Sequence, residues 1–125
     1  MRRKPDDPAR DPAYIQDMLD AALAVQDFVV GKTCEDYAAS LLLRSAVERQ
    51  VEIIGEAARS VSRQTKDSHP EVPWEPIQAQ RHRLVHEYGE IDDDLIWKVA
   101  TVHVPALIDK LRPLLPPPSG SHPSR

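Results

Sequence analysis

The 125-residue sequence has one cysteine, no long apolar run and no excess of basic residues, and each absence excludes a class of protein. Because Cys34 has no second cysteine to pair with, an intramolecular disulfide is excluded and a reducing cytoplasm is the expected location. No apolar run approaches the ~20 residues that a membrane-spanning helix needs. The opening residues, MRRKPDDPAR, lack the apolar core of a secretory signal. The formal net charge of −4 argues against a long non-specific surface for nucleic acid, but leaves room for a local basic pocket.

Strand-like alternation and internal repeats are also missing, whereas helical periodicity runs through most of the chain. With 41% apolar and 29% charged residues, a chain of this length is expected to form one globular domain that buries roughly 65% of its extended surface. We therefore predict an all-α antiparallel bundle of about four to five helices over residues 11–115. The charged residues 1–10 are expected to form a flexible tail, and the Pro/Ser-rich residues 116–125 a disordered one.

Capping residues and helix breakers set the limits of the first predicted helices. Asp11 followed by Pro12 is typical of an N-cap and a first helical position. Gly31 is typical of a helix end. Thr33 with Asp36 three residues later forms a weaker version of the capping box, so a second helix is predicted to start there.

This second helix is predicted to be the longest, from about residue 34 to 65, or roughly 48 Å. Its apolar residues recur at spacings of three and four, as in a helix packed along its whole length: Ala39, Leu43, Val47, Val51, Ile54, Ala58 and Val61. Gly55 lies inside this run, where glycine costs about 1 kcal/mol relative to alanine. We therefore expect Gly55 to permit the close approach of another backbone.

Two further helices complete the predicted bundle. A short one runs from near Trp74 to near Tyr88, and the last one has Asp92–Asp94 at its start, where their carboxylates complement the helix dipole. His103 falls on the apolar stripe of the last helix, so we expect it to be a core histidine with its ring satisfied, or to approach the functional residues from there. Pro105 is expected to kink this helix.

The short helix carries a dense group of polar side chains within eight positions: Arg81, His82, Arg83, His86 and Tyr88. Arg81 also falls on the apolar stripe, and because burying an unpaired guanidinium is costly, such arginines are usually paired or functional. On an ideal helix Arg81 and His86 lie about 140° apart around the axis, so they do not share a face. Either the helix loosens before His86, or a second chain completes the site across a two-fold axis.

The segment RHRLVHEY resembles the R-x-x-x-x-H-x-Y signature of the HEPN superfamily, and more narrowly that of HepT-type toxins encoded beside a minimal nucleotidyltransferase antitoxin. The likeness extends to ERQVEIIGEAARS in the second helix, to PW before the third, and to ID and IW behind the motif, and it covers roughly residues 11–115. It implies a HEPN-like bundle and a homodimer with facing motifs that cleaves RNA without a metal or other cofactor. The implied partners are RNA and the nucleotidyltransferase of a type VII-like toxin–antitoxin pair.

The resemblance also implies roles for single residues, and their chemistry is suitable. A histidine with an ordinary pKa of about 6.5 can take the proton of the RNA 2′-hydroxyl or give one to the leaving oxygen, which suits His86 as the acid–base group. Arginine is the preferred bidentate partner of a phosphate, which suits Arg81. His82 and Arg83 are expected to bind or support the substrate, with His82 at a position where HepT-type toxins most typically have asparagine. Tyr88 matches the residue to which the antitoxin adds AMP units that silence the toxin.

Simpler interpretations remain open for the same residues. Arg81 and His86 are also typical of a structural salt bridge or a solvated helix end, and Tyr88 of a packing residue. His82 and His86 have the spacing of a helical metal site, but no cysteine or further histidine lies at ligand spacing, so no metal site is predicted. Cys34, in the first turn of its helix, is expected to be an inert thiol rather than a reactive one. The alternative function is a non-catalytic helical dimer that binds the nucleotidyltransferase partner or a nucleotide.

Overall fold

The computed structural model describes residues 7–86, 89 and 91–116, and this part of the chain is helical without any strand. Residues 1–6 and 117–125 of the two predicted tails lie outside the described residues, as does Tyr88. The predicted all-α fold is confirmed. The helices are α1 (Asp11–Val29), α2 (Cys34–Ala39), α3 (Leu41–Ser60), α4 (Arg63–Ser68), α5 (Trp74–His86), α6 (Asp93–Lys98) and α7 (Val104–Leu111).

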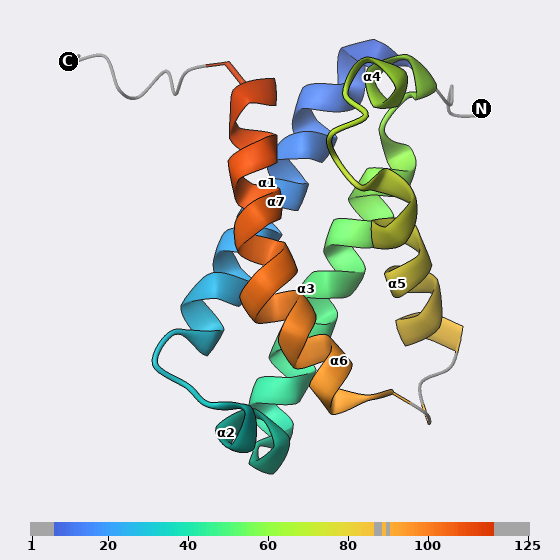
Figure 1. Cartoon of the computed structure of the whole chain (residues 1–125). Coiled ribbons are helices and arrows are strands. Elements are labelled where there is room, and N and C mark those ends of the chain that lie inside the picture. Colours follow the sequence, from blue (N-terminus) through green and yellow to red (C-terminus); the bar gives the residue numbers. More distant parts are fainter. Residues whose placement is uncertain (1–6, 87–88, 90, 117–125) are drawn as a thin grey trace, which may run out of the picture.

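The long helices form an antiparallel bundle (Figure 1). α1 and α3 lie side by side, and α5 packs against α3. α6 continues through a π-helical turn, Val99–His103, into α7, which packs against α1. The short helices α2 and α4 lie at opposite ends of the bundle in Figure 1. Each long helix therefore buries one side against neighbours that run in the opposite direction.

The segment predicted as one helix from 34 to 65 is divided into α2, α3 and α4, so that prediction is wrong. The first division is at Ser40, whose backbone is extended at φ −117° and ψ 105°. Its Oγ accepts a hydrogen bond from the Leu43 N–H at 3.0 Å. A serine that satisfies a first-turn N–H in this way favours a new helix start over continuation of the old helix. The predicted capping box of Thr33 and Asp36, by contrast, is present at the start of α2.

A buried carboxylate ties the start of α1 to the second division, between α3 and α4. Asp11 is the first residue of α1 and not its N-cap, which is Arg10, so the predicted capping role is wrong. Asp11 is 3% exposed and accepts hydrogen bonds from the Ser62 N–H at 2.9 Å, the Ser62 hydroxyl at 2.6 Å and the Thr65 hydroxyl. Ser62 also caps α4 by accepting from the Thr65 N–H at 3.2 Å. This network joins three helix ends at one corner of the bundle.

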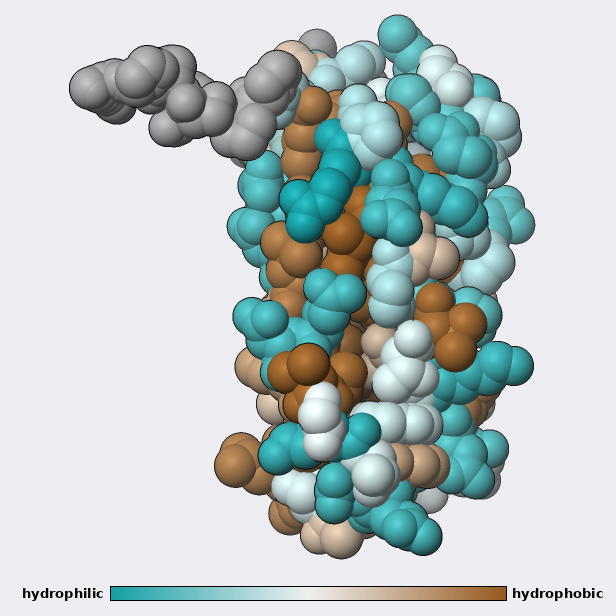
Figure 2. All heavy atoms as spheres, turned by 60° about the vertical axis from the view of Figure 1, so that its left-hand side comes forward, coloured by the Kyte–Doolittle hydropathy of each residue, from teal (hydrophilic) through white to brown (hydrophobic). Residues whose placement is uncertain are grey.

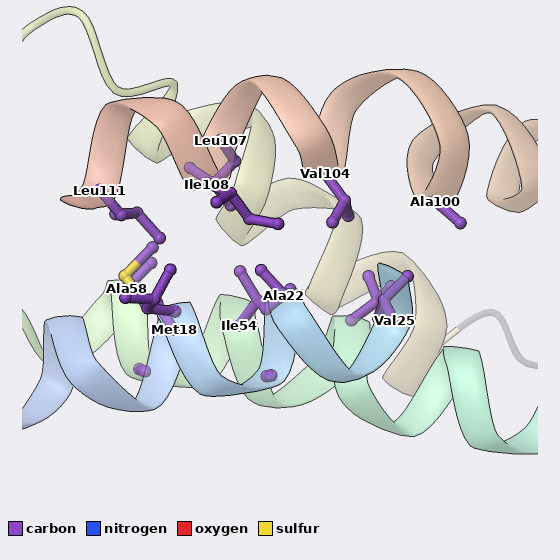
Figure 3. Close-up of a cluster of buried hydrophobic side chains, with 14 of the residues drawn as sticks. Met18, Ala22, Val25, Ile54, Ala58, Ala100, Val104, Leu107, Ile108 and Leu111 are labelled. Carbon is purple, nitrogen blue, oxygen red and sulfur yellow. The ribbon is translucent and has the colours of Figure 1, made fainter. Parts of the chain in front are cut away.

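The core lies between α1, α3 and α7, whose side chains point toward one another (Figure 3). The predicted apolar stripe of α3 is buried from Val47 onward, whereas Leu43 is only partly buried and Ala39 is exposed, because α2 ends there. The buried residues that meet in Figure 3 are Met18, Ala22 and Val25 of α1, Ile54 and Ala58 of α3, and Val104, Leu107, Ile108 and Leu111 of α7.

α6, the π-helical turn and α7 together form the last helical segment, residues 93–111. The π-helical turn decides which side of this segment faces the core. The Val104 N–H donates to the carbonyl oxygen of Val99, five residues earlier, and the next residue, Pro105, has no N–H to offer. Because the turn holds an extra residue, Val104 takes the buried position that regular spacing gives to His103. The predicted core position of His103 is therefore wrong, since His103 is exposed. The irregularity expected near Pro105 takes the form of this π turn.

The outer surface is mixed in polarity. Figure 2 brings forward the side of the molecule that bears α1 and α7, and a column of apolar side chains is visible down its middle between hydrophilic ones. Partly buried residues, among them Leu23, Phe28 and Leu114, pack against the core from outside. No helix within the described ranges is long and apolar enough to cross a membrane.

Candidate functional site

α5 carries the candidate residues and is anchored at its first residue. Trp74 is 6% exposed, and its indole Nε1–H donates to the His69 carbonyl oxygen at 3.0 Å. Pro76 is tolerated because its missing N–H falls in the first turn, where it needs no helical partner. Leu84 is buried, so the same helix has one face in the core and another directed outward. The predicted short helix with its start at Trp74 is confirmed, and its described part ends at His86.

α3 and α5 come into direct contact at Gly55. A Cβ atom placed on Gly55 would lie 2.2 Å from the Cβ of Arg81, 3.0 Å from its Cγ and 3.1 Å from the carbonyl oxygen of Ile77. Only a residue without a side chain permits this approach, which confirms the role predicted for Gly55. The contact fixes the place at which the Arg81 side chain leaves α5.

Arg81 has no acidic partner in the described part of the chain. It is partly buried, and no described carboxylate forms an ion pair with it or with the exposed Arg83. A partly desolvated guanidinium without a counter-charge favours binding of an anion. The simpler interpretation, in which Arg81 forms a structural salt bridge, therefore has no acidic partner for Arg81 among the residues that the structure describes.

His82 and His86 lie on the outward face of α5, one turn apart. Both are exposed, and their ring centroids are 4.4 Å apart with the planes tilted by 43°. A group that exchanges protons with a substrate must be reachable from solvent, and both rings meet this requirement. Arg81 and His86 share no hydrogen bond in the described structure, as expected from their separation of about 140° around the helix. One chain thus brings the two histidine rings together, and among the described residues it forms no hydrogen bond between Arg81 and His86.

Two further questions about this segment concern the modification of Tyr88 and a metal site at His82 and His86. Tyr88 lies outside the described residues, so its modification stays a prediction. Within the described ranges no group of three or more histidine, cysteine, aspartate or glutamate side chains is arranged to hold a metal ion. The pair of His82 and His86 accordingly has no third protein ligand in this part of the chain.

Asp92 is the N-cap of α6, and Asp93 and Asp94 lie in the first turn of that helix. The Asp92 carboxylate accepts hydrogen bonds from the N–H groups of Asp94 and Leu95, at 3.0 and 3.3 Å. The Cys34 thiol donates to the Asp94 carboxylate at 3.5 Å. Desolvation of the thiol, and then this hydrogen bond, raise the pKa of Cys34. The carboxylates thus complement the helix start as predicted, and the raised pKa of Cys34 favours the thiol over the more reactive thiolate.

A groove of about 350 Å³ runs beside α5, and no sequence pattern predicted it. α3, α5 and the last helical segment enclose it, with Ile54, Ile77 and Val99 among its apolar walls. Gln80, the residue before Arg81, also lines the groove, and its Nε2 is buried without a hydrogen-bond partner among the described residues. An unsatisfied buried polar group costs about 1–3 kcal/mol, so this amide is a second candidate functional group.

His103 lines one wall of the groove, and the Arg83 side chain lines a neighbouring hollow. His103, exposed on the π turn, lines the groove, so it approaches α5 from the last helical segment. A second hollow of about 330 Å³ shares Gln80 and Leu95 with the groove and is also lined by Arg83 and Asp92. Polar groups that are distant in sequence thus surround two neighbouring depressions along α5.

Comparison with known proteins places this arrangement in context. Residues 18–114 match the model of the family described as "Ribonuclease HepT-like". The chain is 32% identical over 101 residues, which are 81% of this chain and 92% of the relative, to "Probable ribonuclease HepT" of Thermococcus cleftensis. It is 34% identical over 95 residues, 76% of this chain and 87% of the relative, to a Methanocaldococcus jannaschii protein named "Putative RNase". A Caldanaerobacter subterraneus protein of the same designation is 29% identical over 102 residues, 82% of this chain and 91% of the relative. No solved structure is significantly similar to the chain.

Proposed function

Because the chain belongs to the HepT-like ribonuclease family, we propose that it is the toxin of a type VII-like toxin–antitoxin pair and cleaves RNA without a metal ion. The observation that carries the proposal is the arrangement on α5. His86 is exposed on the outward face, and Arg81, pinned against Gly55, has no described carboxylate to neutralise it. These are an acid–base group open to substrate and a cation available to a phosphate.

The chemistry needs two proton transfers and stabilisation of one charge. A general base takes the proton of the RNA 2′-hydroxyl, the 2′-oxygen attacks the adjacent phosphorus, and the 5′-oxygen leaves with a proton from a general acid. His86 performs one or both proton transfers, since an imidazole has one nitrogen that can accept a proton and one that can donate, and this ring is exposed to substrate. Arg81 binds the phosphoryl oxygens with two parallel N–H groups and stays charged throughout. None of these steps requires a metal ion.

The positions of Arg81 and His86 on α5 favour a site shared by two chains. About 140° of helix separates the two residues, so one copy of α5 does not direct both side chains at one phosphate. A homodimer with facing α5 helices places Arg81 of one chain opposite His86 of the other across a two-fold axis. The cleft between them is the proposed RNA site.

His82 and Arg83 support this site. The His82 ring lies against the His86 ring, with their centroids 4.4 Å apart, so it restricts the orientation of the acid–base group. Arg83 is exposed and supplies a second positive charge for the RNA backbone. These contacts let His82 serve in place of the asparagine that is typical of HepT-type toxins.

Control is proposed to act through Tyr88, two residues after His86 in the sequence. The antitoxin, a minimal nucleotidyltransferase, transfers AMP from ATP to the Tyr88 hydroxyl and releases pyrophosphate. Each AMP unit adds roughly one negative charge, which competes with RNA phosphates for Arg81 and Arg83. The modified toxin is therefore silenced by charge as well as by occupied space.

The test is incubation of the purified protein with total RNA in the presence and absence of EDTA. Wild-type protein is expected to cleave RNA equally well in both conditions, and His86→Ala to be 10²- to 10⁴-fold slower, roughly the loss of an acid–base group. His69→Ala is the matched control, because among the described residues the His69 side chain bonds only Glu71. Cleavage that EDTA stops and zinc restores would contradict the mechanism. No cleavage by pure wild-type protein would favour the alternative of a non-catalytic dimer that binds the nucleotidyltransferase or a nucleotide.

A further inference from the structure

The apolar groove beside α5 takes no part in the catalysis proposed above. Its volume of about 350 Å³ is within the range of small-molecule sites, roughly 300–1,000 Å³. Its walls are apolar except for Gln80 and His103. In sites of this composition the apolar walls bury most of the ligand, and the few polar side chains fix its orientation.

Gln80 sets a specific requirement for the occupant of the groove. Its Nε2 is buried and has no hydrogen-bond partner among the described residues. A purely apolar occupant would leave the amide unpaired, whereas a ligand with a hydrogen-bonding edge would satisfy it. Rotation about the last side-chain bond exchanges the amide oxygen and nitrogen, so Gln80 can pair with an acceptor or a donor.

His103 adds an aromatic ring that is open to solvent. It lies on the π-helical turn, and such turns occur frequently at functional sites. In proteins that bind single-stranded RNA, aromatic side chains and histidines stack against unpaired bases. A ring on the groove wall, opposite α5, is suited to this contact.

The groove also leads toward the proposed catalytic residues. On an ideal helix Gln80, Arg83 and His86 follow one another in steps of about 60° and about 4.5 Å along the axis. Arg83 lines the hollow that shares Gln80 and Leu95 with the groove, together with Asp92, whose carboxylate accepts the N–H groups of Asp94 and Leu95. An RNA strand that leaves the groove and curves around α5 therefore reaches Arg83 and then His86, which lies about 120° around the axis and about 9 Å along it from Gln80.

From these contacts we propose that the groove holds a nucleobase of the single-stranded RNA substrate, next to the nucleotide whose bond His86 cleaves. The base inserts between the apolar walls, Gln80 hydrogen-bonds its edge, and the His103 ring stacks against it. Arg83 binds the phosphate that links the two nucleotides. This inference rests on the proposed ribonuclease function and makes Gln80 a specificity-determining residue.

The alternative occupants are an apolar side chain of a second copy or of a protein partner. Neither would satisfy the amide of Gln80, and neither would need the positive charge of Arg83 beside it, which forms no ion pair with any described carboxylate. A nucleotide brings a hydrogen-bonding edge, a flat face and a negative charge together. The chemistry on the groove wall therefore favours the base.

Binding of a non-cleavable RNA separates this inference from the cleavage reaction. Labelled 2′-O-methyl pentanucleotides lack the attacking hydroxyl, so fluorescence anisotropy measures their affinity for the wild-type protein and for His86→Ala alike. Replacing one nucleotide at a time by an abasic one should weaken binding about tenfold at a single position and less elsewhere. Equal losses at every position, or none, would overturn the proposal.

Leu95→Trp places a large ring in the groove, because Leu95 lines both depressions. This variant should bind the full pentanucleotide about tenfold more weakly than wild type does. It should also bind the full and the abasic pentanucleotides with equal affinity. Val102→Trp is the matched control, since Val102 is 54% exposed on the π turn, and it should bind like wild type. Circular dichroism and thermal unfolding establish that both variants fold. Unchanged affinity of Leu95→Trp refutes the base site, and altered self-association alone would assign the groove to a protein contact.

Gln80→Leu tests the role of the amide alone. Leucine keeps the groove apolar, so removing the base at the sensitive position should still weaken binding. The difference in affinity among the four bases at that position should shrink severalfold. An unchanged base preference would show that Gln80 does not determine specificity. The proposed ribonuclease activity is tested separately. If the protein gives the expected binding results but does not cleave RNA, the cleavage proposal is contradicted and the base site is not.

Discussion

Gly55 and Arg81 lie so close that a Cβ on Gly55 would be 2.2 Å from the Cβ of Arg81. The two residues come from α3 and α5, and they are 26 positions apart in the sequence. The missing side chain of Gly55 lets α5 approach α3 closely, and the stem of Arg81 occupies the space that results. The glycine of one helix thus sets the position of the proposed phosphate-binding side chain on another.

Gly55→Ala is expected to destabilise the protein although alanine is the better helix former. Alanine gains about 1 kcal/mol of helix propensity, but its methyl group collides with the rigid stem of Arg81 and forces α5 outward. We expect a net loss of about 2 kcal/mol in the free energy of unfolding, measured by urea denaturation. Gly89→Ala is the control, because a Cβ on Gly89 meets no atom of the described residues within 4 Å. A Gly55→Ala variant as stable as wild type would mean that α3 and α5 are not in tight contact.

Asp11→Ala is expected to lower stability without changing the active residues. The change removes the acceptor of three hydrogen bonds and leaves the Ser62 N–H buried without a partner. Hydrogen bonds to charged groups contribute about 1.5–3 kcal/mol, so we expect a loss of about 2 kcal/mol in the free energy of unfolding. Asp17→Ala, at an exposed position of the same helix, should change it by less than about 0.5 kcal/mol. RNA cleavage per folded molecule should be unchanged, because Asp11 contacts the α3–α4 corner and not α5.

Arg81→Lys is expected to impair RNA cleavage although it preserves the positive charge. Lysine is a point charge and cannot form two parallel hydrogen bonds to a phosphate. We expect the rate to fall at least tenfold, with the free energy of unfolding within about 1 kcal/mol of wild type, because the aliphatic stem that packs at Gly55 is kept. Single-turnover cleavage and urea denaturation provide the two measurements. Arg59→Lys, an exposed arginine on α3, is the control and should cleave normally.

The native assembly is expected to be a homodimer with facing α5 helices. Sedimentation velocity at micromolar concentration should give one species of twice the chain mass of 14.1 kDa. Mixing His86→Ala with Arg81→Ala provides a stronger test, since a shared site restores one intact pairing in each heterodimer. Recovery of part of the wild-type activity is the expected result. A monomer, or a mixture as inactive as its components, would contradict the shared cleft.

Tyr88→Phe is expected to cleave RNA and to escape silencing by modification. Phenylalanine keeps the ring but has no hydroxyl to receive AMP, and Arg81 and His86 are unaltered. Incubation with the cognate nucleotidyltransferase and ATP should raise the mass of wild-type protein by one or more AMP units and lower its activity. Mass spectrometry and cleavage assays must follow separation of the two proteins, so that inhibition by bound nucleotidyltransferase is not mistaken for inhibition by modification. Full modification of Tyr88→Phe would show that the target lies elsewhere.

Local features of the fold were predictable because their causes lie within one or two helical turns. The capping box of Thr33 and Asp36, the start of α5 at Trp74 and the cap at Asp92 each depend on neighbours along the chain. Gly55 was predictable for a related reason, since a glycine in a helix interior is costly unless another element needs the space. The candidate residues Arg81, His82, Arg83 and His86 were found from their chemistry and spacing on one short helix.

Other features were decided by tertiary packing. Serine occurs inside helices as well as at their ends, so the breaks at Ser40 and Ser62 depend on where the neighbouring helices lie. His103 was misplaced because a π turn adds one residue to the helical repeat, and regular periodicity cannot anticipate that shift.

The groove at Gln80 arises only where α3, α5 and the last helical segment meet. The sequence by itself determined which segments become helices and which polar residues α5 displays. The tertiary structure decided which of these residues lie together, because contacts between helices depend on the whole bundle and not on neighbours in the chain.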